Sequence, residues 1–171
     1  MKILFLGAPG SGKSTQGQIL AENKGWKWVS PGQMFRESGD PEILEIIKTA
    51  RLVPDGIVIK MVIDAIKDLD DVILDGYPRN LKQCESLVEN QIGIDAIVEI
   101  VVPEEELIKR SLARGRAQDT AEVVKERIGM YQETRNLIVN FFEEKQRVKV
   151  LQVNGVGEIE EIARRVKEVV G

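Results

Sequence analysis

Short apolar runs alternate with amphipathic segments along most of this chain. Two of the runs, Val72–Leu74 and Ile97–Val102, are almost continuously Val, Ile and Leu, which is typical of strands covered on both faces. Strands of this kind, separated by helices, require crossover connections. The pattern therefore predicts a doubly wound α/β fold with five parallel strands and helices on both faces. The candidate strands are Lys2–Leu6, Trp26–Ser30, Asp71–Asp75, Asp95–Val102 and Val148–Val153.

The segment between the second and third candidate strands is helical throughout and longer than one crossover needs. Its helical patterns cover Gln33–Glu37, Pro41–Ala50 and Pro54–Leu69. We therefore expect a small helical insertion, residues 30–53, that stands over the C-terminal edge of the sheet.

Capping signals mark the helices of the second half. Pro103 suits the first position of a helix, and the acidic residues 104–106 favour the positive end of its dipole. Asp119 and Glu122 have the spacing of a capping box, which predicts a long helix that ends at about Lys145. The last helix is predicted over Glu158–Val170.

Composition narrows the function classes. The 171 residues suffice for one domain with a substantial core. A net charge of −4 excludes general affinity for nucleic acid, which needs a basic surface. The single cysteine, Cys84, excludes an internal disulfide and a cysteine-based zinc site, and the absence of histidine excludes imidazole catalysis. A strand that starts at Lys2 leaves no signal peptide, and no apolar run spans a membrane, so we expect a cytoplasmic protein.

A glycine-rich loop, Gly7–Thr15, follows the first strand directly and opens the first helix. It matches the pattern G-x-x-x-x-G-K-[ST], in which glycines let successive backbone N–H groups surround an anion. The helix dipole points to the same position. Lys13 can reach the outer phosphates of a nucleotide, and the Ser14 hydroxyl can ligate Mg²⁺. The candidate ATP-binding residues of this loop are Gly10, Ser11, Gly12, Lys13, Ser14 and Thr15.

A carboxylate and several arginines complete the candidate site. Asp75 ends a buried parallel strand, where open α/β sheets bind ligands, and can hold Mg²⁺ through its water shell. Phosphoryl transfer needs positioning and neutralisation of charge rather than an acid–base residue. The planar guanidinium of arginine suits phosphate oxygens, and Arg79 follows a proline in a short turn just after Asp75.

Taken together and in order, these segments resemble the nucleoside monophosphate kinases, most closely the adenylate kinases, over almost the whole chain. The resemblance implies a P-loop NTPase fold in a single domain, residues 1–171, with a nucleoside-monophosphate-binding insertion over residues 30–53. The runs that carry it are Gly7–Thr15, Val29–Arg36, Leu52–Asp55, Leu74–Gln83 and Arg114–Arg127.

The resemblance also implies roles for individual residues. Arg36 and Arg79 would hold the α-phosphate of the acceptor, and Gln83 would hydrogen-bond its base. Arg116 and Arg127 would contact the transferring phosphoryl group, with Arg114 beside them. The implied AMP-binding residues are Pro31, Gly32, Arg36, Val53, Gly76, Arg79 and Gln83; Arg110 and Arg114 would lie over the donor ATP.

The chain departs from the family pattern at three places. The lid is reduced to the loop 112–119, which predicts weaker closure over the donor. Pro31 removes a hydroxyl and a backbone donor near the acceptor base, so base selectivity stays open. Gln33 replaces a carboxylate of the family's magnesium network, which leaves Asp75 more alone as an Mg²⁺ ligand. Gln118 stands where the family often has the first of two acidic residues, so that only Asp119 is left.

The sequence therefore predicts a magnesium-dependent adenylate kinase that converts ATP and AMP into two ADP. It requires Mg²⁺ but no zinc, binds neither nucleic acid nor membrane, and acts as a monomer. Two alternatives remain: a kinase for another acceptor, such as CMP or UMP, and a non-catalytic nucleotide-binding sensor.

Overall fold

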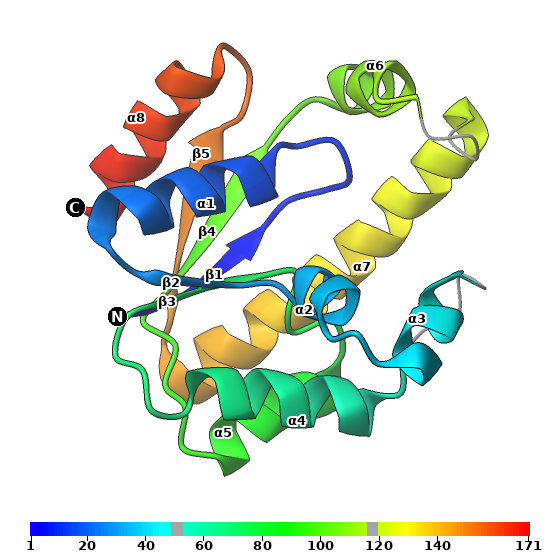
Figure 1. Ribbon diagram of the computed structural model, residues 1–171. Helices are drawn as coiled ribbons and strands as arrows, with labels where there is room; N and C mark the ends of the chain where they lie inside the picture. Colours follow the sequence, from blue (N-terminus) through cyan, green and yellow to red (C-terminus); the bar gives the residue numbers. More distant parts are fainter. Residues whose placement is uncertain (49–52, 116–119) are drawn as a thin grey trace.

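The computed structural model describes residues 1–48, 53–115 and 120–171. In this part of the chain five parallel strands form one sheet in the order β2-β3-β1-β4-β5, which confirms the predicted α/β fold (Figure 1). Chain neighbours β1 and β2 are not adjacent, because β3 lies between them. The strands are β1 (Lys2–Leu6), β2 (Lys27–Val29), β3 (Val72–Asp75), β4 (Ala96–Val101) and β5 (Lys149–Asn154).

Helices cover both faces of the sheet, as Figure 1 shows. One face packs against α1 and α8, and the other packs against α4, α5 and α7. Ile3 and Phe5 of β1 pack in the core on the face covered by α1 and α8, whereas Leu4 packs in the core on the opposite face. This alternation follows from the two-residue period of a strand. The helices are α1 (Lys13–Lys24), α2 (Pro31–Glu37), α3 (Pro41–Lys48), α4 (Asp55–Ile66), α5 (Leu81–Glu89), α6 (Glu104–Ala113), α7 (Ala121–Gln146) and α8 (Ile159–Val170).

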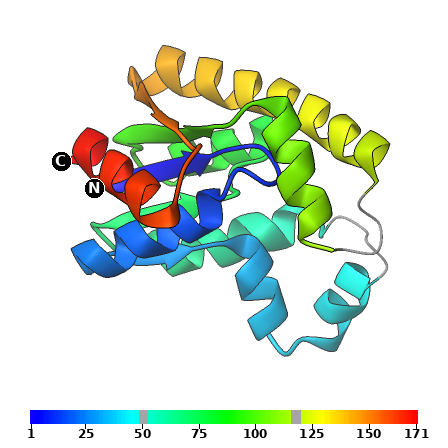
Figure 2. The same cartoon turned by 90° about the horizontal axis from the view of Figure 1, so that it is seen from above.

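Two groups of helices extend beyond the sheet at the same end of the molecule. Seen from above in Figure 2, α2 and α3 lie on one side, while α6 and the beginning of α7 lie on the other. The loop between β1 and α1 lies at this end too, because parallel strands place all their carboxyl ends at one edge. Ligand-binding residues from distant parts of the sequence can therefore meet here.

Several predicted boundaries are corrected. Pro103 precedes α6 as its N-cap, so the helix itself starts with the acidic run. The N-cap of α7 is Thr120, whose hydroxyl accepts a hydrogen bond from the Val123 N–H at 3.3 Å, so the expected capping box at Asp119 and Glu122 is wrong. Asp119 lies outside the described residues. No helix among the described residues is long and apolar enough to cross a bilayer.

Candidate active site

The loop between β1 and α1 has the backbone geometry of an anion site. Gly10 and Gly12 adopt left-handed conformations, with φ of 88° and 84°, which side chains other than glycine rarely tolerate. Gly12 is the N-cap of α1, and the first turn of that helix contains no acidic residue and no side-chain cap. The first N–H groups of α1 are therefore available to bind an anion.

Helix α6 packs directly on this loop. A Cβ atom added to Gly10 would lie 2.7 Å from Ser111 Oγ and 2.9 Å from the carbonyl oxygen of Leu107, both on α6. Ser111 is fully buried in this contact, and Ser11 of the loop is buried as well. Arg110 lies in the last turn of α6, and Arg114 is the C-cap of this helix. The packing of α6 on the loop therefore fixes the backbone positions of both arginines relative to the loop.

Asp75 faces the loop from the end of β3. It lies opposite Phe5 in the pairing of β3 with β1, and only 3% of its surface is exposed. Its buried Oδ1 atom accepts no hydrogen bond from any described residue. A buried carboxylate oxygen of this kind requires a cation or ordered water, which suits the predicted metal role.

The donor set fits Mg²⁺ held largely through water. Asp75 and Ser14 both offer oxygen, the ligand that Mg²⁺ prefers, and both line one cavity. Among the described residues, no cluster of three or more acidic or cysteine side chains could enclose a metal directly.

The pKa of Lys13 is set by burial and by three charged neighbours. Burial lowers the pKa of its ammonium group, Asp75 opposes that change, and the charges of Arg79 and Arg114 lower the pKa further. The net effect is a pKa below the ordinary 10.5. A partly desolvated cation beside two arginines is stabilised when phosphate anions arrive.

A cavity of about 620 Å³ brings most of the predicted site together. Its walls come from the glycine-rich loop, α2, the end of β3, α6 and α7, and its side chains are predominantly basic. The predicted residues in its lining are Gly10, Gly12, Lys13, Ser14, Thr15, Gly32, Arg36, Asp75, Gly76, Arg79, Arg110, Arg114 and Arg127.

Four predicted residues lie elsewhere. Ser11 and Pro31 are buried and line neither cavity, and Val53 packs against the core. Gln83 is 4% exposed and lines neither the cavity above nor the smaller one described next. Arg116 lies outside the described residues.

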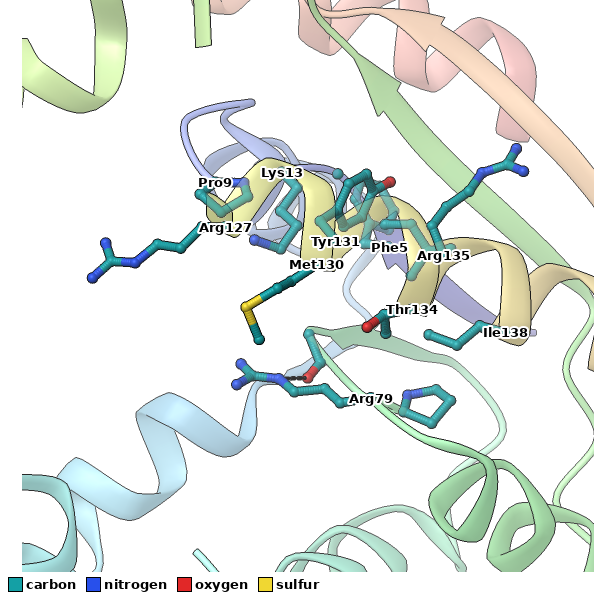
Figure 3. A pocket seen from close by; sticks show the side chains of 14 residues that line it. Phe5, Pro9, Lys13, Arg79, Arg127, Met130, Tyr131, Thr134, Arg135 and Ile138 are labelled. Atoms are coloured by element: carbon teal, nitrogen blue, oxygen red, sulfur yellow. Dashed lines mark hydrogen bonds between the residues drawn. The ribbon is translucent and has the colours of Figure 1, made fainter. Parts of the chain in front are cut away.

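A second cavity of about 320 Å³ adjoins the first and shares Lys13, Arg79 and Arg127 with it. Figure 3 shows that one wall is α7, from which Met130 extends toward Arg79. Met130 and Thr134, which line this cavity, were not among the residues predicted from the sequence. Their helical spacing from Arg127 could have revealed them, since residues three to four and seven apart share one face of a helix.

Arg79 is held in a fixed pose by the turn that precedes it. Its Nε donates a hydrogen bond to the Gly76 carbonyl oxygen at 2.8 Å, which Figure 3 shows as a dashed line. Gly76 has a φ of 71°, and a Cβ atom there would lie 3.2 Å from Arg79 Nη2. Arg79 thus held lines both cavities.

The two arginines at the rims of the site have local partners. Arg36 Nη2 donates to Gln33 Oε1 at 2.8 Å, so Gln33 orients an arginine of α2. Arg110 Nε donates to Glu106 at 2.8 Å, and its Nη1 donates to the Gly155 carbonyl oxygen at 3.0 Å. The second bond ties the end of α6 to the loop after β5.

Comparisons with known proteins identify relatives over most of the chain. Residues 5–147 match the family model described as adenylate kinase. An adenylate kinase of Prochlorococcus marinus (strain MIT 9301) is 36% identical over 89% of this chain and 90% of its own. An adenylate kinase of Mycolicibacterium vanbaalenii is 35% identical over 100% of this chain and 99% of its own. One from Corynebacterium glutamicum (strain R) is 32% identical over the same shares, 100% and 99%.

Proposed function

The chain belongs to the adenylate kinase family, and from that premise we propose that it transfers the γ-phosphoryl group of ATP to AMP, forming two ADP. The observation that carries the proposal is the single basic cavity in which Lys13, Asp75 and Arg79 meet. Such a cavity can bind two sets of phosphates and neutralise the charge that passes between them.

The donor phosphates bind the glycine-rich loop. Backbone N–H groups of residues 10–14 surround the β-phosphate, and Lys13 neutralises the outer phosphates. Arg110 and Arg114, at the end of α6, lie over the donor nucleotide. The direct contact of α6 with Gly10 supports this assignment, because it joins the arginines to the loop.

The acceptor binds on the opposite wall, against α2. Arg36 and Arg79 hold its phosphate in line with the donor, and Gly76 allows close approach of the backbone. Gly32, Pro31 and Val53 contribute to the pocket of the acceptor base, and Gln83 hydrogen-bonds that base. Helices α2 and α3, within residues 30–53, thus form the acceptor-binding element.

Ser14 and, through water, Asp75 would hold Mg²⁺, which would supply neutralisation of charge on the donor phosphates. The chain itself supplies the remaining positive charge around the transferred group. Arg127 on α7 shares both cavities with Lys13 and Arg79, which supports a contact to that group. Arg116, in the short lid 112–119, has the same proposed role.

All of these groups come from one chain, so we propose that the monomer is the active form. We also propose that the protein acts in the cytoplasm, where both nucleotide substrates are made and used.

The test is the initial velocity of ADP formation from Mg·ATP with AMP, CMP, UMP, GMP and dTMP. We expect AMP to be preferred and Arg79→Ala to lower kcat/KM for AMP by about 100- to 1,000-fold. Arg79→Lys keeps the charge but loses the bidentate contact, so it restores only part of the rate. Arg164→Ala, which removes an exposed arginine of α8, is the matched control and leaves the velocity unchanged.

Other outcomes have distinct meanings. A preference for CMP or UMP would keep the phosphoryl-transfer site and change the acceptor, which would direct attention to Pro31. ATP binding without turnover of any acceptor would identify a nucleotide sensor and contradict the proposal.

A further inference from the structure

The side-chain amide of Gln83 is engaged at both ends. Its Oε1 accepts a hydrogen bond from the backbone N–H of Arg79 at 2.7 Å, and its Nε2 donates to Asp55 Oδ1, also at 2.7 Å. Asp55 is the first residue of α4, whereas Gln83 lies in α5, so the contact joins two helices.

These two partners permit only one orientation of the amide. A backbone N–H can only donate, and an ionised carboxylate can only accept. If the amide turned over, its NH₂ group would face the Arg79 N–H and its oxygen would face the Asp55 carboxylate. Both contacts would be repulsive, and two hydrogen bonds would be lost.

Asp55 is itself held firmly in this acceptor role. Asn80 Nδ2 donates to both of its oxygens, at 3.0 and 3.1 Å, while Asn80 Oδ1 caps α5 by accepting from the Gln83 N–H. Hydrogen bonds from Asn80 and Gln83 lower the pKa of Asp55, so the carboxylate is ionised at neutral pH. The position of Asp55 at the start of α4 also favours a negative charge.

We propose that Asp55 is a specificity-determining positioning residue: by holding the Gln83 amide in one orientation, it makes the acceptor site distinguish a 6-aminopurine from a 6-oxopurine. The inference rests on the proposed function, in which the acceptor base reaches and hydrogen-bonds Gln83, a side chain that is 4% exposed and lines neither cavity. It goes beyond that function by naming the residue that decides which base edge Gln83 can read.

The discrimination between the two purines follows from the donor and acceptor sites of the Gln83 amide that its bonds to Arg79 and Asp55 leave available. After its bonds to Asp55 and Arg79, Gln83 retains one N–H donor and one oxygen lone pair. Adenine presents an acceptor, N1, beside its 6-amino donor. Hypoxanthine presents the reverse, an N1–H donor beside the acceptor O6. For a base held in one pose, an amide that pairs with adenine therefore opposes hypoxanthine at both atoms.

Base selectivity in the mutants provides the test, because IMP differs from AMP only at these two positions. We measure kcat/KM for AMP and for IMP in the wild-type protein, Asp55→Asn and Asp55→Ala. The wild-type ratio should be at least about 1,000, since a site built around hydrogen bonds strongly rejects a mismatched partner. Asp55→Asn offers a donor as well as an acceptor, so residue 55 can pair with either orientation of the Gln83 amide and only the Arg79 N–H still opposes the turned one; the ratio should fall by about tenfold or more.

Asp55→Ala should give an intermediate ratio, because alanine bonds neither orientation of the amide, so a turned amide gains no partner at residue 55 while the Arg79 N–H still favours the original orientation. The matched control is Asp64→Asn, which alters an exposed carboxylate on the same helix that pairs with Lys60. This control should keep the wild-type ratio. Asp55→Ala also keeps the proposal testable if Asp55→Asn does not fold.

A merely structural role for Asp55 predicts something different. AMP and IMP would then lose activity equally in both variants, with an unchanged ratio, and that result would overturn the inference. Failure of the proposed function is recognised separately, because the wild-type protein itself would then form no ADP from ATP and AMP.

Discussion

Arg135 on α7 donates two hydrogen bonds to the carboxylate of Glu99 on β4, from Nε to Oε1 at 2.9 Å and from Nη2 to Oε2 at 2.8 Å. Tyr131 and Gln152 donate to the same carboxylate at 3.0 Å. Burial raises the pKa of Glu99, but these bonds outweigh it and leave the pKa below 4.5. The buried carboxylate therefore fastens α7 to the sheet about two turns away from Arg127.

Removal of Arg135 should destabilise the protein. Glu99 is 8% exposed and Arg135 24% exposed, so Arg135→Leu leaves a buried charge with too few partners. We expect a loss of about 3 kcal/mol in the free energy of unfolding, measured by urea denaturation at neutral pH.

The control for this prediction is Arg164→Leu, which breaks an exposed pair with Glu168. It should cost less than about 1 kcal/mol. If both variants lose equal stability, the Glu99 contact does not anchor α7.

Gly10 and Gly12 should differ in their tolerance of alanine. Both have a positive φ, so each substitution strains the backbone by about 1–2 kcal/mol. A Cβ at Gly10 would also meet Ser111 and the Leu107 carbonyl oxygen, whereas one at Gly12 would meet no atom within 4 Å. Gly10→Ala should therefore weaken ATP binding more than Gly12→Ala, as measured by calorimetry, because α6 must move away.

A double variant separates the two causes of the Gly10 effect. Ser111→Gly removes the hydroxyl but leaves the Leu107 carbonyl oxygen, which belongs to the helix backbone, so it should rescue Gly10→Ala only partly. Equal losses of ATP affinity in Gly10→Ala and Gly12→Ala would show that α6 imposes no constraint on the loop.

The lowered pKa of Lys13 predicts a characteristic pH profile. In the unliganded protein, Lys13 loses its proton below the ordinary pKa of 10.5. Because phosphates bind the protonated form, kcat/KM for ATP should fall as the pH rises through the lowered pKa. Bound phosphates raise that pKa, so kcat should fall only at higher pH.

The pH–rate profiles of the wild-type protein and Lys13→Arg provide the measurement. Arginine stays protonated throughout this range, so the residual activity of the variant should lack the alkaline decline. The same decline in both proteins would assign it to another group.

The backbone geometry of the candidate phosphate-binding loop could be predicted from sequence because its parts are neighbours in the chain. Residues 10–14 form this candidate anion site through local backbone geometry, and the helix that follows adds its dipole. Asp75 was predictable for a related reason, since the end of a buried parallel strand is a ligand-binding position in this class of fold. Adjacent residues and regular periodicity carry this information without any knowledge of tertiary contacts.

Only the tertiary structure decided which distant residues support the site. The order of strands places β3 beside β1 and so brings Asp75 to the loop, and no local pattern contains that order. The pairs Asp55–Gln83 and Glu99–Arg135 join separate elements through the packing of helices on each other and on the sheet. Their hydrogen bonds depend on ångström-scale positions that arise from the whole core, whereas a residue type alone records only what each side chain is able to bind.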